Sequence, residues 1–278
     1  MKYNILLVDG PYLAHRSECS PFQVSTRDGR SATMILGFMR SLNALRKQFN
    51  PKKIIVTWES HGTKSWRREM YPEYKPKKEV TDDFIEQLKD IQRLLKLFRV
   101  EQYSADNNEA DDVIATISAQ MNYPDDDPIV IFTVDKDIMQ VVNQFVHIWN
   151  GKMLITKKEV GEKFDINPDQ IPDFLAIVGD SADNIKGLSG YGPKKVADLL
   201  NDHFLYIEDM KNHELQEHKE KLLLNKKLTT LNKNCKLRPY EIDGQFSKTQ
   251  ILDKYELDSI KSKLSEYNLL GGKRKKFW

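Results

Sequence analysis

The stretch "YNILLVD", residues 3–9, indicates how the chain folds. It is a short run of apolar, mostly branched residues that ends in a carboxylate. Runs of this length, bounded by polar residues, Gly or Pro, are typical of buried strands. Further runs of the same kind follow it, at residues 53–58, 100–104, 128–134 and 145–150. The sequence therefore predicts a sheet built from these segments.

Segments with helical periodicity lie between the predicted strands. Apolar residues recur at i, i+3 and i+4 over residues 32–49, 81–98 and 107–121. Strands that alternate with helices form βαβ crossovers, which predicts an α/β fold with a mostly parallel sheet flanked by helices on both faces. From about Asn167 onward the pattern is helical throughout. We therefore expect a core over residues 1–166 and a helical region over residues 167–278.

Composition excludes several classes of protein. At 278 residues, with 40% hydrophobic and 30% charged residues, the chain can bury a core of its own. Cys19 and Cys235 lie far apart without a CxxC pair, so neither a disulfide framework nor a thiolate zinc site is expected. No apolar run reaches the length of a signal peptide or a membrane span. These features predict a protein of a reducing cytoplasm with no membrane partner.

Acidic residues follow the predicted strands at the point where each strand ends. They are Asp9, Glu59, Glu109, Asp111, Asp112, Asp135 and Asp137. Each has an ordinary explanation, because helix N-termini and turns favour carboxylates. In an open α/β sheet, however, the carboxyl ends of the parallel strands meet at one edge, where ligands bind. We therefore expect these acids to face the same edge of the sheet.

Carboxylates gathered at one edge would repel one another and raise each other's pKa values unless cations bound between them. The donors are all oxygens, with no His or Cys among them, which favours Mg²⁺ or Mn²⁺ over zinc. The acids outnumber the ligands that one ion needs. This number suggests two metal ions, the arrangement used for phosphodiester hydrolysis.

A second informative stretch is "FLAIVGDSADNIKGLSGYGPKKVADLL", residues 174–200. Asp180 and Asp183 add two carboxylates to the candidate ligands. Glycines and lysines then lead into a new helix: Gly187, Gly190, Gly192, Lys194 and Lys195. Glycines let the backbone approach a phosphate, and the first N–H groups of a helix face such an anion. A glycine turn between helices is usually only a turn, but this one follows two further candidate metal ligands.

Five motifs stand in order along about residues 4–240. They are "LLVDGPYLAHR", "SWRREMYPEYKPKK", "EADD", "VDKD" and "GDSADNIKGLSGYGPKKVADLL", followed by "LTTLNKNCKLRP". Together they resemble the structure-specific 5′ nucleases, the family of flap endonucleases and 5′→3′ exonucleases. The resemblance implies a PIN-like core over residues 1–166, a helical arch over residues 62–98 and an all-helical C-terminal DNA-binding region. It also implies a helix-hairpin-helix-type turn at about residues 174–200 and a basic C-terminal tail.

The resemblance also implies roles for individual residues. The implied metal ligands are Asp9, Glu59, Glu109, Asp111, Asp112, Asp135, Asp137, Asp180 and Asp183. The implied catalytic residues are Lys75, Arg67, Asp9, Asp111 and Asp135. The implied DNA-binding residues are Arg67, Tyr71, Tyr74, Lys75, Lys78, Gly187, Gly190, Gly192, Lys194 and Lys195.

Helical geometry divides these ligands between the two implied ions. On an ideal helix Glu109 and Asp112 lie about 60° apart while Asp111 faces elsewhere, so the three cannot serve one ion equally. We expect one site, which generates the nucleophile, to consist of Glu109, Asp111, Asp135 and Asp9, with Asp112 in support. We expect the other site to consist of Asp137, Asp180 and Asp183.

The implied activity is metal-dependent hydrolysis of phosphodiesters at 5′ flaps and 5′ ends of DNA, in replication or repair, including the removal of RNA primers. The implied cofactors are two Mg²⁺ or Mn²⁺ ions, with K⁺ at the glycine turn. The implied partners are DNA with 5′ flaps, nicks or junctions and RNA–DNA hybrids. We expect a monomer in the cytoplasm of a bacterium or of a phage-infected host.

Three other functions fit part of the sequence. A PIN-type ribonuclease would share the acidic edge but would not need the duplex-gripping turn after Asp183. A non-catalytic protein that binds DNA junctions would keep that turn and lose the acids. A phosphohydrolase of small molecules would need neither the turn nor the basic, aromatic stretch 64–78.

Overall fold

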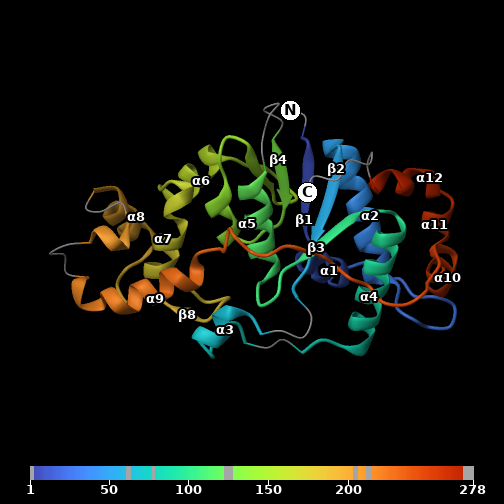
Figure 1. Cartoon of the computed structure of the whole chain (residues 1–278), viewed down its shortest axis with the longest axis horizontal. Helices are drawn as coiled ribbons and strands as arrows, with labels where there is room; N and C mark the ends of the chain where they lie inside the picture. Colours follow the sequence, from blue (N-terminus) through green and yellow to red (C-terminus); the bar gives the residue numbers. More distant parts are fainter. Residues whose placement is uncertain are drawn as a thin grey trace.

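One central sheet organises the computed structural model, which describes residues 3–60, 64–76, 79–121, 128–202, 206–210 and 215–271 (Figure 1). In spatial order its strands are β6 (Leu154–Ile155), β5 (Val146–Trp149), β4 (Ile129–Phe132), β1 (Ile5–Asp9), β2 (Lys53–Thr57), β3 (Glu101–Ser104) and β9 (Arg238–Pro239). The strands from β5 to β3 pair in parallel, whereas β6 and β9 pair antiparallel at the two edges. The predicted mostly parallel sheet is confirmed.

Alternating residues of β1 build a separate hydrophobic core on each face of the sheet. Ile5 and Leu7 pack on one face, and Leu6 and Val8 pack on the other. On the first face, α5 (Ala110–Gln120) packs against the strands. The same core continues away from the sheet through α6 (Lys157–Phe164), α7 (Ile171–Val178), α8 (Pro193–Asp202) and α9 (Lys219–Thr229). The second face is covered by α1 (Gly10–Glu18), α2 (Thr33–Phe49) and α4 (Asp82–Leu97). Short 3₁₀ turns lie at Asp137–Val141, Pro168–Gln170, Ile207–Asp209, Gln216–His218 and Asn268–Gly271.

Helix α4 shows why the sequence predicts its helices well. The Thr81 hydroxyl accepts a hydrogen bond from the Phe84 N–H, and two aspartates occupy the first turn, where the helix dipole favours negative charge. Its apolar stripe, which includes Ile91 and Leu95, packs into the core on the α2 side of the sheet. The second half of the predicted arch, residues 82–97, is therefore part of the layer that covers the sheet.

The region after residue 166 contains short strands that the sequence pattern does not predict. β7 (Gly179–Asp180) and β8 (Ile185–Lys186) form an antiparallel pair between α7 and α8. Helix α9 packs against α7. Strands of two residues are too short to show the alternation of apolar and polar residues that identifies a strand. This explains why the sequence alone predicts only helices here.

The last described segment returns to the opposite side of the sheet. After β9, the helices α10 (Lys248–Lys254), α11 (Asp258–Lys261) and α12 (Leu264–Tyr267) join the core formed by α2 and α4 (Figure 1). The Tyr255 hydroxyl donates to Asp90 of α4 at 3.0 Å, and Lys47 of α2 lies 2.6 Å from Glu266. The basic tail 273–278 lies outside the described residues. None of the described helices has the length and apolar character needed to cross a bilayer.

Candidate active site

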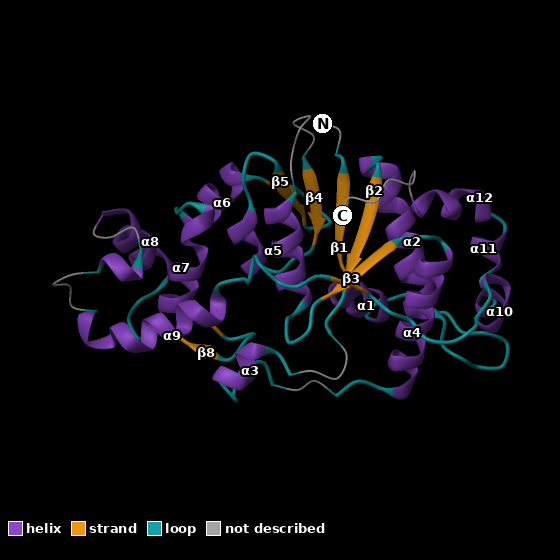
Figure 2. Cartoon of the chain, in the orientation of Figure 1, coloured by secondary structure: helices purple, strands orange, loops and turns teal. Residues whose placement is uncertain are grey.

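The carboxyl ends of β1 and β4 bring three of the predicted acids to one edge of the sheet (Figure 2). Asp9 is the last residue of β1, and its carboxylate accepts hydrogen bonds from the Tyr12 N–H at 3.0 Å and from the Thr133 hydroxyl at 2.8 Å. Asp135 follows β4, and it accepts from the backbone N–H of Asp137 at 3.0 Å. Parallel pairing therefore places residues from distant parts of the sequence side by side, as predicted.

Asp9, Asp111 and Asp135 form what we call the first acidic group. Burial, reinforced by the charge of Asp135, raises the pKa of Asp9 to about 6. Burial, followed by the charges of Asp135 and Asp9, raises the pKa of Asp111 well above its usual range. Such mutual repulsion shows that the three carboxylates lie within electrostatic reach of one another, and a cation between them would relieve it.

Asp137, Asp180 and Asp183 form a second acidic group. All three are buried, and each offers a carboxylate oxygen within 4.8 Å of the other two. The buried Oδ1 atom of Asp137 has no hydrogen-bond partner, which is costly for an oxygen that could accept one. Burial, followed by the charges of Asp135, Asp183 and Asp180, raises the pKa of Asp137. An all-oxygen group with an unsatisfied oxygen fits a hard divalent cation such as Mg²⁺ or Mn²⁺.

Lys75 links Glu109 to the second acidic group. Its Nζ atom lies 2.7 Å from Glu109 and 3.7 Å from Asp183, and its backbone N–H donates to the Asp183 carbonyl at 3.1 Å. Burial lowers the pKa of Lys75, but the charges of Glu109, Asp111 and Asp183 outweigh burial and raise it overall. Lys75 therefore carries a positive charge among the carboxylates.

Tyr74 occupies a different position from the one expected. Its ring is 2% exposed, and its hydroxyl donates to Asp183 at 2.6 Å and lies 3.2 Å from a Glu109 oxygen. The predicted role of Tyr74 in DNA binding therefore disagrees with this structure, because the ring is buried and its hydroxyl holds two carboxylates. Tyr71 is half-buried, and its hydroxyl donates to Glu73. Lys78 lies outside the described residues.

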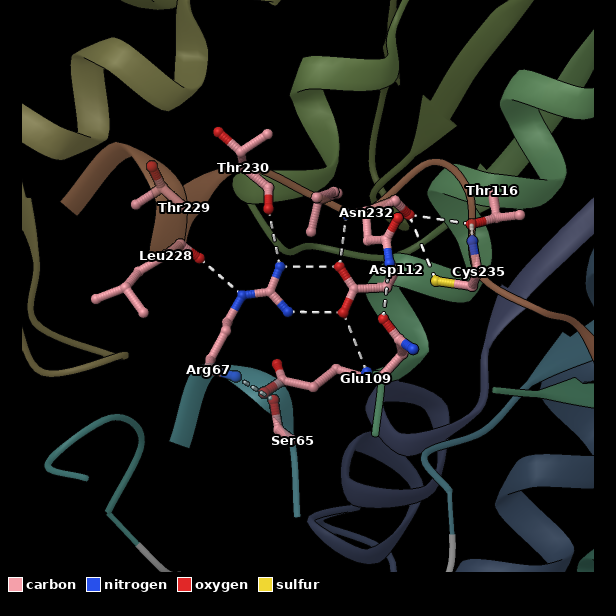
Figure 3. A network of polar contacts seen from close by, with 12 residues as sticks. Ser65, Arg67, Glu109, Asp112, Thr116, Leu228, Thr229, Thr230, Asn232 and Cys235 are labelled. Carbon is pink, nitrogen blue, oxygen red and sulfur yellow. Dashed lines mark hydrogen bonds and ion pairs between the residues drawn. The ribbon is translucent and has the colours of Figure 1, made fainter. Parts of the chain in front are cut away.

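Arg67 and Asp112 also depart from their predicted roles, because they bind each other (Figure 3). The Arg67 side chain is almost wholly buried, and its guanidinium donates to both carboxylate oxygens of Asp112, at 2.7 and 2.8 Å. A buried charge needs such a partner, and the planar guanidinium matches a carboxylate in two parallel bonds. Neither side chain is free to bind a metal ion or a phosphate in this structure, which corrects both assignments.

Glu59 and Glu109, the two predicted glutamate ligands, differ in their exposure. Glu59 follows β2 with an exposed side chain, and partial loss of hydration, followed by the charge of Glu109, raises its pKa. Glu109 is buried and bound by Lys75, and although burial raises its pKa, the charges of Lys75 and Arg67 lower it overall. Glu109 is therefore ionised at the edge, while its place among the ligands stays a prediction.

The glycine turn separates into a packed part and an open part. A Cβ atom on Gly187 would lie 2.2 Å from the carbonyl oxygen of Val178, so a close backbone contact requires glycine here. Gly187 therefore has a packing role, and its contact with DNA stays a prediction. Gly190, with a φ of 81°, and Gly192 both face open space ahead of α8. The exposed residues Lys194 and Lys195 follow in the first turn of that helix.

Two polar residues at the edge have no counterpart in the expectations from sequence. Thr133 donates to Asp9, and the Lys136 ammonium lies 3.0 Å from Asp180 of the second acidic group. Lys136 stands between two acids in "VDKD", and that position is the one sequence signal that could have indicated it. Thr133 carries no such signal, because threonine at a strand end is common.

Comparison with protein-family models matches the chain in two consecutive parts. The model of the 5′-3′ exonuclease N-terminal resolvase-like domain matches residues 4–165. The model of the 5′-3′ exonuclease C-terminal SAM fold matches residues 166–250.

Individual relatives agree with these matches. A 5′-3′ exonuclease of Mycoplasmopsis pulmonis is 33% identical over 250 residues, covering 84% of this chain and 82% of the relative. A 5′-3′ exonuclease of Aquifex aeolicus is 30% identical over 274 residues, covering 95% and 92%. The structure is also similar to that of bacteriophage T5 D15 flap endonuclease in complex with DNA and metal ions, with a TM-score of 0.68, 20% identity and coverage of 95% and 99%. This last similarity concerns the fold.

Proposed function

The chain belongs to the 5′-3′ exonuclease family, and we propose that it hydrolyses phosphodiester bonds at 5′ flaps and 5′ ends of DNA in replication or repair. The observation that carries the proposal is the position of Lys75. It contacts Asp183 of the second acidic group, and its charge acts on Asp9 and Asp111 of the first. A cation among carboxylates, at the edge where α/β sheets bind ligands, suits an anionic substrate held beside metal ions.

The two acidic groups would hold the metal ions, which we take to be two Mg²⁺ or Mn²⁺. When bound, such ions generate a nucleophile from water at neutral pH and stabilise charge on the leaving oxygen. The charge of Asp135 acts on residues of both groups, so Asp135 would help to hold a metal ion at this edge. The Thr133 hydroxyl and the Tyr12 N–H orient Asp9 for this purpose.

Lys75 would contact the phosphate of the substrate. Its side chain is 31% exposed, so the ammonium can reach a ligand while Glu109 holds it in place. A fixed positive charge at the phosphate stabilises the negative charge that grows in the transition state. Lys75, Asp9, Asp111 and Asp135 are therefore the catalytic residues of this proposal.

Duplex DNA would lie against the open part of the glycine turn. Gly190 and Gly192 leave the backbone accessible, and Lys194 and Lys195 place positive charge beside the first N–H groups of α8. Contacts of this kind bind phosphates without reading bases, so the substrate would be selected by its junctions rather than by its sequence. A K⁺ ion at the turn, activity on RNA–DNA hybrids, a monomeric state and a cytoplasmic location complete the proposal.

Cleavage assays with three substrates test the function. The protein is incubated with 5′-flap DNA, with RNA–DNA hybrid and with single-stranded RNA, each with Mg²⁺ and with chelator. We expect Mg²⁺-dependent release of the 5′ strand from flap DNA and no cleavage with chelator. Cleavage confined to single-stranded RNA would identify a PIN-type ribonuclease, and binding of the flap without cleavage would identify a junction-binding protein.

A further inference from the structure

A buried ion pair ties three distant parts of the chain together beside the acidic edge (Figure 3). Arg67 lies in α3 (Trp66–Met70), which belongs to the described segment 64–76, and Asp112 lies in α5. Besides Asp112, the guanidinium donates to the carbonyl oxygens of Leu228 at 2.7 Å and of Thr230 at 3.1 Å, at the end of α9. The Arg67 side chain thus connects residues 64–76, helix α5 and the end of α9.

Asp112 is fully committed to this network. Its Oδ1 atom also accepts the backbone N–H of Asn232 at 2.8 Å, and its Oδ2 atom also accepts the backbone N–H of Glu109 at 3.2 Å. A carboxylate has about four lone-pair sites, and with the two bonds from Arg67 all of them are used. The side chain is also wholly inaccessible to solvent. Asp112 is therefore chemically distinct from the neighbouring Asp111, although both stand in the same acidic motif.

The network fixes two groups that face the substrate. Asp112 holds the backbone of Glu109, and the Glu109 carboxylate accepts from Lys75 at 2.7 Å. Lys75 follows Arg67 in the same described segment, so the guanidinium anchors the chain that carries the ammonium. The backbone N–H of Lys75 then donates to Asp183, which lies in the helical region. These bonds form a closed set of contacts between the first and second halves of the chain.

We propose that Arg67 and Asp112 are positioning residues, which hold Glu109 and Lys75 in register with the second acidic group. This inference rests on the proposed nuclease function. Because the partners at Leu228 and Thr230 belong to the helical region, the pair also fixes the acidic edge relative to the helices that would hold duplex DNA. A reacting group displaced by about 1 Å can lose about 100-fold in rate, so a modest loosening of this network is sufficient to affect catalysis.

The test compares Arg67→Lys, which keeps the charge and loses the planar fork, with Asp112→Asn, which keeps the shape and loses the charge. Asp90→Asn is the matched control, because Asp90 is an equally buried carboxylate bound by Arg93 and Lys254 on the far side of the sheet. Single-turnover cleavage of a 5′ flap is measured across a Mg²⁺ titration, below the thermal midpoint of each variant. The double variant Arg67→Lys/Asp112→Asn completes a double-mutant cycle, which measures the coupling between the two residues.

We expect each single variant to lose about 10-fold to 100-fold in single-turnover rate while the Mg²⁺ midpoint stays within about twofold of the parent. The double variant should be no slower than the slower single variant, because both remove one shared contact. A Mg²⁺ midpoint raised about tenfold in Asp112→Asn, with full recovery of rate at high Mg²⁺, would make Asp112 a ligand and overturn the proposal. A parental rate in folded Arg67→Lys would overturn it as well.

Hydrogen exchange gives a readout that does not need a substrate. Arg67→Lys should raise amide exchange together in residues 64–76, 109–112 and 228–232, whereas Asp90→Asn should leave these segments unchanged. Unchanged exchange in Arg67→Lys would overturn the positioning role whatever the cleavage assay shows. If the parent protein cleaves no flap but exchange rises as expected, the network stands and the proposed function fails. Should Asp112→Asn not fold, Arg67→Lys carries the test.

Discussion

The Lys75 ammonium lies 2.7 Å from a Glu109 carboxylate oxygen, and the backbone of Lys75 adopts a left-handed conformation to bring it there. Its φ of 45° is uncommon for a residue other than glycine and costs roughly 1 kcal/mol. The hydrogen bond from its backbone N–H to Asp183 compensates for part of this cost. A strained residue held by several contacts at a candidate site is a reason to test its function directly.

Lys75→Ala should slow single-turnover cleavage of a 5′ flap by at least about tenfold, because the fixed charge at the phosphate is lost. Duplex affinity should change little, since the glycine turn is untouched. Lys158→Ala is the control, because Lys158 is an exposed lysine on α6 that pairs with Glu162. A parental single-turnover rate in Lys75→Ala would remove Lys75 from the catalytic residues.

Asp111→Asn and Asp183→Asn should differ in how they respond to Mg²⁺. Loss of Asp111 removes a ligand of the first acidic group, so hydrolysis should be abolished at all Mg²⁺ concentrations. Loss of Asp183 should raise the Mg²⁺ concentration needed and leave some activity, with DNA binding retained as negative charge is removed. Magnesium titrations of both variants on a 5′-flap substrate measure this difference. Near-normal turnover in Asp111→Asn would show that the acids at the start of α5 only stabilise the end of that helix and do not bind a catalytic metal ion.

Gly192→Val should weaken duplex binding without disturbing the fold, because a Cβ atom at Gly192 meets no neighbour within 4 Å. The added side chain would stand where the backbone is proposed to approach a phosphate. Affinity for duplex DNA and the thermal midpoint are measured together, with Gly161→Ala on α6 as a second open position and control. Duplex affinity equal to that of the parent would exclude this turn from the DNA contact. Gly187→Val, by contrast, should fail to fold stably because of the Val178 carbonyl.

The metal-free protein should lose stability as pH rises. Burial raises the pKa of Asp9 from 3.8 to about 6, so the folded state binds the Asp9 proton more tightly than the unfolded state does. The stability that this proton contributes is fully present below pH 3.8 and is lost as pH rises through about 6. A shift of this size corresponds to about 3 kcal/mol for Asp9 alone. The raised pKa values of Asp111 and Asp137 act in the same direction.

Thermal midpoints with chelator at about pH 5 and pH 7.5 test this expectation, and the midpoint at the lower pH should be higher. Added Mg²⁺ should raise the midpoint mainly at the higher pH, because the ion binds the ionised carboxylates. A midpoint with chelator that is independent of pH over this range would contradict the assigned burial of these acids.

The sheet and its acidic edge were predictable because their signals are local. Each strand is a short apolar run, and a single rule about parallel strands then gathers the acids that follow them. This rule alone predicts that Asp9, Asp135 and Asp137 lie at the same edge of the sheet. The glycine turn was visible for a similar reason, since glycines ahead of a helix are close together in the sequence.

The partners of Arg67, Tyr74 and Asp112 could not be predicted in the same way. Arg67 and Asp112 are 45 positions apart, and an arginine among tyrosines in a basic stretch is also what a surface that binds single strands would show. The choice between surface and interior depends on the packing of α3 against α9, which leaves no local pattern. β9 escaped prediction because a pair of residues containing Pro239 lacks the signature of a strand.

Because β3 pairs with β9, the sheet can be completed only late in the synthesis of the chain. Until Arg238 and Pro239 have left the ribosome, the outer side of β3 has no hydrogen-bonding neighbour in the sheet, although β1 and β2 are complete much earlier. An unpaired strand edge is a template on which other chains can add. A nascent chain that stalls before residue 238 therefore exposes a strand edge that is prone to aggregation, and pairing with β9 covers this edge once the full-length chain is released.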